Sequence, residues 1–188
     1  MAYQERNVGT QEHQARTGEA TSHGSSPAKW LACMAPQHRY LFALEHTGEV
    51  IRGATITKLP FTHAWFCGLI SVRGKLHGVI DLPGFLATHQ GDMPQETGGL
   101  EHPVHEVSGC IVTLGAVLGL PCGLVVGKLE GLRSPGDFQR VASRLGDHGP
   151  LISGIYRDPA DRQWLEVNLI DLVASAMARS ISLEPELL

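Results

Sequence analysis

Long hydrophobic runs and an excess of positive charge are both missing from this sequence. Nowhere do about 18 apolar residues follow one another, the length at which a membrane-spanning helix is considered. Lys and Arg number 15 against 19 Asp and Glu, so the formal net charge of −4 argues against a nucleic-acid-binding protein. The N-terminus also lacks the basic and then apolar segments of a secretory signal. We therefore expect a cytoplasmic protein that binds no nucleic acid and inserts into no membrane.

Motifs for the common catalytic chemistries are absent as well. The chain has no G-x-S-x-G nucleophile turn, no glycine-rich loop ending in G-K-[ST], and no C-x-x-C pair. Its cysteines stand singly beside small or apolar residues, which favours buried, unreactive thiols in a reducing compartment; they are Cys33, Cys67, Cys110 and Cys122. These patterns call for neither an enzymatic activity nor a cofactor, and at this point they leave an enzyme open.

The high number of histidines suggests an alternative, a function that depends on metal or ligand binding. Ten are present, and the densest cluster is E-H-P-V-H-E at Glu101–Glu106. Pro103 prevents a helix from placing His102 and His105 on one face. The alternative hypothesis is a stand-alone β-barrel enzyme, or a ligand- or metal-binding protein, that uses these histidines.

The most informative stretch is Trp65–Leu82, W-F-C-G-L-I-S-V-R-G-K-L-H-G-V-I-D-L. Two apolar runs, 66–72 and 76–82, flank the pair Arg73-Gly74, which is the pattern of a β-hairpin whose glycine supplies a positive φ. The first run is apolar on both faces apart from Ser71, so we expect an interior strand. A charged arginine at the tip of such a hairpin is a candidate functional residue.

A weaker copy of this hairpin occupies residues 151–172. When Gly68 is set against Gly154, the apolar runs match, and Ile80-Asp81-Leu82 is matched with Ile170-Asp171-Leu172. The turn of the copy is longer, R-D-P-A-D-R, with a strong loop signal in Asp-Pro. This repeat predicts two similar β-rich subdomains.

The remaining segments are organised around these two hairpins. Residues 1–27 are polar and contain almost no large apolar side chain, so we expect a disordered tail followed by one folded region, 28–188. A polar stretch, about 88–106, is expected to be the loop that connects the subdomains. Further strands are expected at 29–35, 40–44, 107–114 and 119–127, with a bend or a single helical turn at 45–51 and a bend at 128–132.

One convincing helix is predicted, at residues 168–180. Asn168 can cap it, and Asp171 lies near the positive end of its dipole. Apolar residues recur at three- and four-residue spacing and predict a stripe that packs in the core, formed by Leu169, Leu172, Val173, Ala176 and Met177.

The hairpin 65–82 resembles the signature of the CheW adaptor family, and most of all its PilI branch, the adaptors of the type IV pilus chemosensory system. The resemblance extends to Tyr40–Ile51, with Glu49 at an acidic position of the family, and to Gly123–Gly131. It covers about residues 28–182. Ser71 replaces an asparagine of the motif, and Gly127 replaces an aspartate.

The resemblance implies a mainly β fold of two pseudo-symmetric five-stranded β-barrels with a C-terminal helix. It implies a non-enzymatic scaffold that couples the cytoplasmic tips of membrane-bound chemoreceptors to the regulatory domain of a CheA-type histidine kinase. Arg73 is the residue that the family ties to this coupling, and Glu49 stands where its acidic partner would be. Gly68 and Gly74 match glycines that flank the same surface.

Overall fold

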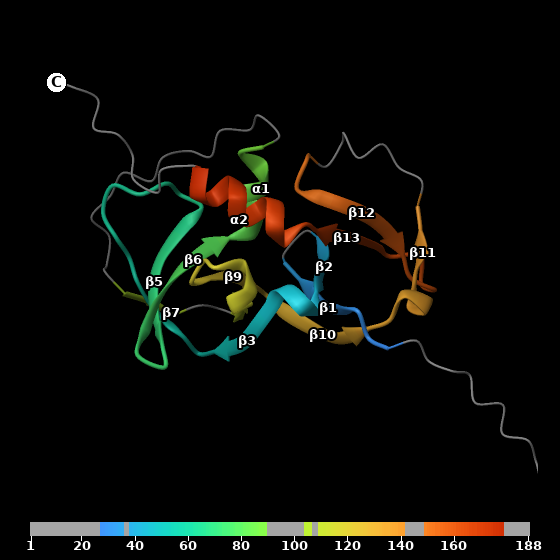
Figure 1. The fold of residues 1–188 in the computed structure, drawn as a ribbon, viewed down its shortest axis with the longest axis horizontal. Helices are drawn as coiled ribbons and strands as arrows, with labels where there is room; N and C mark the ends of the chain where they lie inside the picture. Colours follow the sequence, from blue (N-terminus) through green and yellow to red (C-terminus); the bar gives the residue numbers. More distant parts are fainter. Residues whose placement is uncertain (1–26, 36–37, 90–103, 107–108, 142–148, 179–188) are drawn as a thin grey trace, which may run out of the picture.

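The computed structural model describes residues 27–35, 38–89, 104–106, 109–141 and 149–178, and its described strands form two sheets (Figure 1). The six-stranded sheet has the order β10-β1-β2-β13-β12-β11. Its strands are β1 (Trp30–Met34), β2 (Arg39–Ala43), β10 (Lys128–Arg133), β11 (Gln139–Arg140), β12 (Ile152–Arg157) and β13 (Gln163–Val167).

The seven-stranded sheet has the order β3-β8-β9-β6-β5-β4-β7. Its strands are β3 (Thr47–Arg52), β4 (Thr55–Thr57), β5 (Phe66–Val72), β6 (Lys75–Asp81), β7 (Val104–Glu106), β8 (Cys110–Leu114) and β9 (Cys122–Val126). Without the pieces of three residues or fewer, β4, β7 and β11, each sheet keeps five strands. The predicted mainly β fold with two similar five-stranded halves is confirmed.

The two sheets repeat one arrangement of strands. The order β10-β1-β2-β13-β12 corresponds to β3-β8-β9-β6-β5, and each contains a single parallel contact at its centre, β2 with β13 and β9 with β6. Strand β3 follows β2 in sequence but pairs with β8, and β10 follows β9 but pairs with β1. Each half therefore donates one strand to the other half, which ties them into one unit.

The two hairpins are equivalent, but their predicted alignment was wrong at its C-terminal end. Both first strands contain a bulge at the matched glycine, Gly68 or Gly154. Asp81 then caps the helix after β6, and Asn168 caps the helix after β13. The true counterpart of Ile80-Asp81-Leu82 is therefore 167–169 and not 170–172. Sequence letters alone misplaced the match, because the cap in the second half is Asn168 and the letters I-D-L occur three residues later, inside the helix.

Two α-helices follow the two hairpins, α1 (Leu82–Ala87) after β6 and α2 (Leu169–Ala178) after β13. In α2, Asn168 Oδ1 accepts hydrogen bonds from the backbone N–H groups of Ile170 and Asp171, each at 3.2 Å, as its predicted capping role requires. Four of the five residues of the predicted stripe are buried. Met177 is the exception, with 69 % of its surface exposed.

Two segments predicted to bend are mainly strands. The first, predicted at 45–51 as a bend or a single helical turn, does begin with a 3-10 turn, η1 (Leu44–His46), and continues as β3 from Thr47. β3 and β10 are paired over most of their length with β8 and β1, each interrupted by a bulge. Their sequences, T-G-E-V-I-R and K-L-E-G-L-R, lack regular alternation because the bulge shifts the side chains between the two faces. The predicted connecting loop likewise contains a strand, since β7 pairs with β4. Residues 1–26 of the predicted tail and most of the predicted loop lie outside the described residues.

The main core lies between the two sheets and under both helices. One apolar cluster includes Phe42 of the first sheet, Leu124 of the second, Phe85 of α1 and Leu172 of α2. Each sheet also has a smaller cluster of its own, aromatic around Trp30 and Trp164 in one half and aliphatic around Ile70, Val79 and Ile111 in the other.

Candidate functional site

The tip of the β5–β6 hairpin is a two-residue turn in which both residues are left-handed. Arg73 has φ +50° and Gly74 has φ +80°. This is the turn class whose twist matches that of a hairpin, and it favours Asn or Gly at its first position. A positive φ at Gly74 was expected; the one at Arg73 was not. The turn holds the arginine at the end of the hairpin with 80 % of its side chain exposed.

Glu49 is held in place by the bulge of β3. The bulge lies between Thr47 and Val50, opposite the buried Thr113 of β8. The backbone N–H of Glu49 donates to Thr113 Oγ1 at 2.7 Å, and the threonine hydroxyl donates to the Glu49 carbonyl oxygen at 3.2 Å. A Cβ on Gly48 would lie 2.5 Å from that hydroxyl, so glycine is required there.

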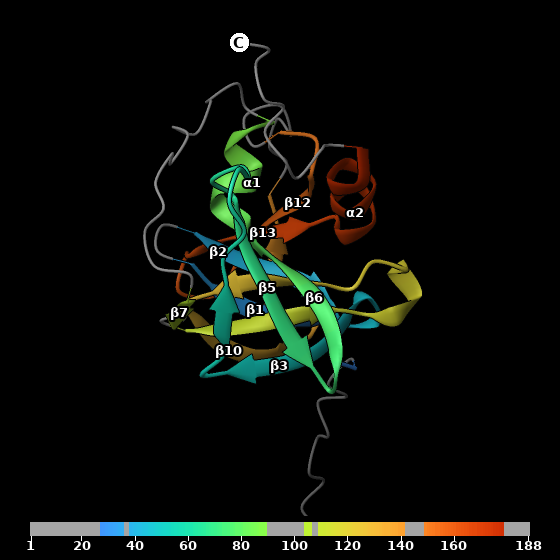
Figure 2. The ribbon, with the colours of Figure 1, turned by 90° about the vertical axis from the view of Figure 1, so that its left-hand side faces the viewer.

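Arg73 and Glu49 form an ion pair. Arg73 Nη2 lies 3.1 Å from Glu49 Oε2, and the side chains are 80 % and 48 % exposed. Strands β8 and β9 separate β3 from the hairpin in the order of the sheet. The contact therefore requires the sheet to curl, and Figure 2 shows the tip of the β5–β6 hairpin next to β3. Because both groups are exposed, the pair contributes only about 0–1 kcal/mol to stability.

The two candidate glycines have different environments. Gly74 is exposed at the turn, and nothing lies within 4 Å of the position that its Cβ would take. Gly68 is buried at the bulge of β5 with φ +130°, and a Cβ there would come within 2.3 Å of the carbonyl oxygen of Thr57. Gly68 therefore allows β4 to approach β5, and only Gly74 reaches the surface.

An exposed apolar side chain and an open strand edge accompany the ion pair. Leu76, three residues after Arg73, is 64 % exposed, and Val50, next to Glu49, is 39 % exposed. Ser71 pairs with Leu76 across the hairpin and is also exposed. β3 is the end strand of its sheet, so in the described part of the chain its outer backbone groups face no further strand.

In the corresponding β12–β13 turn of the six-stranded sheet, both arginines form ion pairs with aspartates of the same turn. Arg157 Nη1 lies 2.6 Å from Asp161 Oδ1, and Arg162 Nε lies 2.7 Å from Asp158 Oδ2. Burial alone would raise the pKa of Asp158, but hydrogen bonds from the Trp164 indole and from the backbone and side chain of Arg162 lower it to about 2. Both arginines of this turn are thus bound within it, whereas Arg73 reaches out to another strand.

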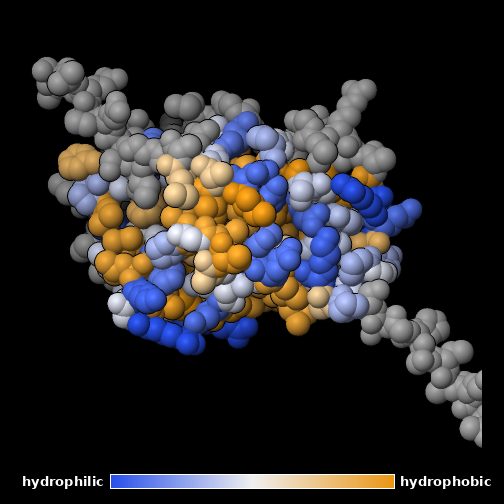
Figure 3. All heavy atoms as spheres, viewed as in Figure 1, coloured by the Kyte–Doolittle hydropathy of each residue, from blue (hydrophilic) through white to orange (hydrophobic). Residues whose placement is uncertain are grey.

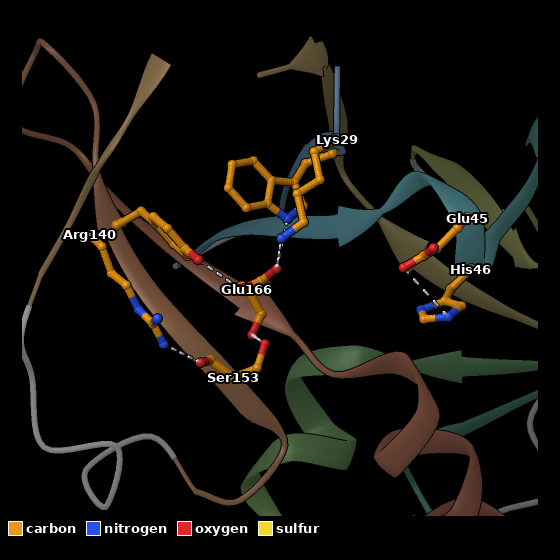
Figure 4. Close-up of polar contacts among 8 residues, drawn as sticks. Lys29, Glu45, His46, Arg140, Ser153 and Glu166 are labelled. Atoms are coloured by element: carbon orange, nitrogen blue, oxygen red, sulfur yellow. Dashed lines mark hydrogen bonds and ion pairs between the residues drawn. The ribbon is translucent and has the colours of Figure 1, made fainter. Parts of the chain in front are cut away.

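A half-buried carboxylate that the sequence did not reveal lies on β13. Glu166 accepts hydrogen bonds from the indole of Trp30 at 2.8 Å and from the hydroxyl of Tyr156 at 2.9 Å, and Lys29 Nζ lies 3.7 Å away (Figure 4). Arg140 donates to the carbonyl oxygen of Ser153 beside it. The Glu166 carboxylate thus contacts only groups of, or next to, the six-stranded sheet to which β13 belongs, among the contacts described. These contacts indicate a packing role.

The described residues offer no group of three His, Cys, Asp or Glu placed to hold a metal ion. His102 lies outside the described residues, so the alternative metal site stays a prediction. Burial raises the pKa of the thiols of Cys33 and Cys122 to about 12. It also raises the pKa of Cys67, to about 11, and that of Cys110. The predicted unreactive character of the four thiols is supported.

Comparisons with known proteins identify the family and agree with the fold. Residues 29–177 match the model of the family described as CheW-like domain. Among solved structures, the fold is similar to that of the scaffolding protein TtCheW from Thermoanaerobacter tengcongensis, with a TM-score of 0.55 and 19 % identity over 75 % of this chain and 88 % of that one. A search of curated proteins finds no match. No helix among the described residues is long and apolar enough to cross a membrane. The chain belongs to the CheW-like domain family.

Proposed function

We propose that this chain is a non-enzymatic chemosensory scaffold that couples chemoreceptors to a CheA-type histidine kinase. The observation that carries the proposal is the Arg73–Glu49 ion pair, exposed at the hairpin tip of a CheW-like domain. The similar structure is that of a scaffolding protein, in keeping with a binding role. The kinase docks through its regulatory domain, and the receptor through its cytoplasmic tip, so the protein works in the cytoplasm at membrane-bound receptor arrays.

The surface of the proposed kinase contact has the chemistry of a strand-docking site. Among the described residues, no strand pairs with the outer edge of β3, and β-strand addition uses the backbone groups of such an edge for affinity. Leu76 and Val50 add exposed apolar area, while the charged pair fixes orientation. Gly74 permits the turn that presents Arg73, and Gly68 contributes indirectly by positioning β5 against β4.

Substitution of Arg73 tests this surface. Arg73→Ala is expected to change the free energy of unfolding by about 0–1 kcal/mol, because the ion pair is exposed. It is expected to weaken binding of the kinase regulatory domain about tenfold or more, as the loss of a charged contact at an interface does. Calorimetric titration of the purified domains measures the binding, and thermal unfolding checks the stability.

Arg157→Ala is the matched control. Arg157 is also an exposed arginine in an ion pair beside a hairpin turn, but its partner Asp161 belongs to the same turn. Binding should be unchanged in this variant. If the two variants bound equally well, or if Arg73→Ala unfolded the protein without affecting the binding of the folded fraction, the assignment of the surface would be wrong.

We further propose that the output of this system is type IV pilus motility, on the likeness of the hairpin 65–82 to the PilI branch. Deletion of the gene is then expected to abolish twitching and leave swimming unchanged. Loss of swimming alone would assign the chain to a flagellar system while leaving the scaffold proposal intact.

A further inference from the structure

A pocket opens at the end of the molecule that carries β11, away from the tip of the β5–β6 hairpin (Figure 1). Its volume is about 300 Å³, at the lower end of the range for small-molecule sites. Its walls come from the end of β10, from the 3-10 turn η3 (Pro135–Asp137) with the residue after it, and from the β12–β13 turn. Figure 3 shows mainly hydrophilic residues on this end of the molecule. The pocket is thus separate from the surface around Arg73.

The apolar wall of the pocket is held in place from behind. The Phe138 ring makes edge contacts with the rings of Trp30 and Trp164, with the centroids 5.7 Å apart in each case. Both tryptophans are buried. Pro159 and Ala160 of the β12–β13 turn supply the rest of the apolar lining. Because the ring is packed on buried neighbours, this wall is formed before any ligand binds, which lowers the cost of binding.

The two acidic residues of the pocket are bound within their own turns. Asp137 accepts a hydrogen bond from the backbone N–H of Ser134 at 2.8 Å. Asp158 accepts four hydrogen bonds, which use the acceptor positions of a carboxylate; the donors are the backbone N–H groups of Ala160 and Arg162, Arg162 Nε and the indole of Trp164. The charge of Asp158 is therefore compensated inside the turn.

The two arginines of the pocket keep donors for a ligand. Arg162 contacts Asp158 through Nε, which leaves its two Nη groups outside that bond. Arg133 contacts no carboxylate of the described residues, and its Nη1 donates to the carbonyl oxygen of Leu132 at the long distance of 3.4 Å. A guanidinium group presents its N–H donors in a planar fork that matches a carboxylate. The pocket therefore combines two guanidinium groups with an apolar wall.

We propose that this pocket binds a carboxylate carried on a small apolar or aromatic group. The carboxylate lies between Arg133 and Arg162, and the apolar group lies on Phe138 and Pro159. The volume equals that of about ten water molecules, at about 30 Å³ each, so a ligand of about ten non-hydrogen atoms fills it. Phenylacetate has this size and this chemistry. A free aromatic acid and the last residue of a peptide both offer such a group.

Titration of the full chain with phenylacetate, followed by NMR of the indole N–H signals, tests the pocket. The Trp164 indole donates to Asp158 at 3.0 Å, so its signal should shift and saturate. The signal of Trp65, in the main core, should stay fixed. Phenylacetamide has the same shape without the charge and should bind at least about tenfold more weakly.

A short peptide that ends in phenylalanine distinguishes the two sources of the carboxylate. Tighter binding of this peptide than of phenylacetate, lost when its C-terminus is amidated, would support the proposal with a protein C-terminus as the ligand. Binding of phenylacetate without binding of the peptide would support it with a free acid as the ligand.

Three variants locate the binding. Arg133→Gln removes one guanidinium group and should weaken phenylacetate binding about tenfold. Asp137→Asn keeps an acceptor for Ser134 and removes a negative charge beside the ligand, so it should strengthen binding. The control is Arg157→Gln, since Arg157 belongs to the same turn as Arg162 but does not line the pocket, and it should leave binding unchanged.

Three results would overturn the proposal: a Trp164 signal that does not move up to the solubility limit of phenylacetate, equal affinities for phenylacetate and phenylacetamide, or an unchanged affinity in Arg133→Gln. The proposed scaffold function is tested separately at Arg73, so neither test depends on the outcome of the other.

Discussion

At the scale of single residues, the two candidate glycines of the hairpin have different roles, Gly68 in strand packing and Gly74 in the exposed turn. Gly68→Ala is expected to destabilise the protein by about 2–4 kcal/mol, because the added Cβ would meet the carbonyl oxygen of Thr57 and because φ is +130°. Gly74→Ala should cost only about 1 kcal/mol, since only the left-handed backbone opposes it. Chemical denaturation of both variants measures the difference. Equal losses would show that β4 does not press on β5 at Gly68.

Asp158 makes stability depend on pH in the acidic range. Its folded-state pKa of about 2 lies below the ordinary value of 3.8, so the unfolded chain binds the proton more readily. The stabilisation is therefore present above about pH 4 and is lost as the pH falls towards 2. The gap in unfolding free energy between the natural chain and Asp158→Asn should shrink between pH 5 and about 2. A constant gap over that range would contradict the role of the charge.

Sequence reasoning predicted the Arg73–Glu49 pair but not the contacts that support it. Arg73 was found from the hairpin pattern and Glu49 through the family resemblance, and the structure adds the distance of 3.1 Å that joins them. Thr113 and Glu166 gave no signal, because a buried hydroxyl and a half-buried carboxylate receive their roles from strands distant in sequence. Met177 was assigned to the core since spacing alone cannot show where the buried arc of a helix ends.

At the scale of elements, the bulge of β3 is the device that positions the acidic partner. Thr113→Val removes the hydroxyl that both donates to and accepts from the backbone of Glu49, and should destabilise the protein by about 1–3 kcal/mol. It should also weaken kinase binding, because the bulge that orients Glu49 loses both hydrogen bonds to the Thr113 hydroxyl. Thr113→Ser keeps the hydroxyl and should retain binding. Titration with the kinase regulatory domain measures both affinities. Equal affinities for the two variants would contradict the role of the Thr113 hydroxyl in positioning Glu49.

The two hairpins could be predicted, and β3 and β10 could not. The hairpins at 66–81 and 152–167 show long apolar runs around clear turns, although the first strand of each contains a bulge. β3 and β10 contain only two large apolar residues each, and a bulge breaks the period of two in both. The same two strands cross from one half to the other. That exchange depends on long-range pairing, for which the local sequence carries no signal.

At the scale of the whole molecule, the two halves share a fold and differ in their turns. One hairpin presents Arg73 to a separate strand, and the other binds its arginines to aspartates within its own turn. The two equivalent hairpins therefore differ in their arginines: Arg73 pairs with a residue of another strand, and Arg157 and Arg162 pair within their own turn. Of the two turns, only the first joins its arginine to a carboxylate on a separate strand, the end strand β3.

The measurement that tests the central claim most directly is receptor control of kinase activity in a reconstituted mixture. Receptor fragments, the CheA-type kinase and ATP are combined with no scaffold, with this chain, with Arg73→Ala or with Arg157→Ala, and kinase autophosphorylation is followed with and without receptor. The account predicts that receptor changes the kinase rate only when the natural chain or Arg157→Ala is present, and much less with Arg73→Ala. A kinase rate that ignores the receptor in the presence of the natural chain, or coupling that is equal in all three proteins, would contradict it.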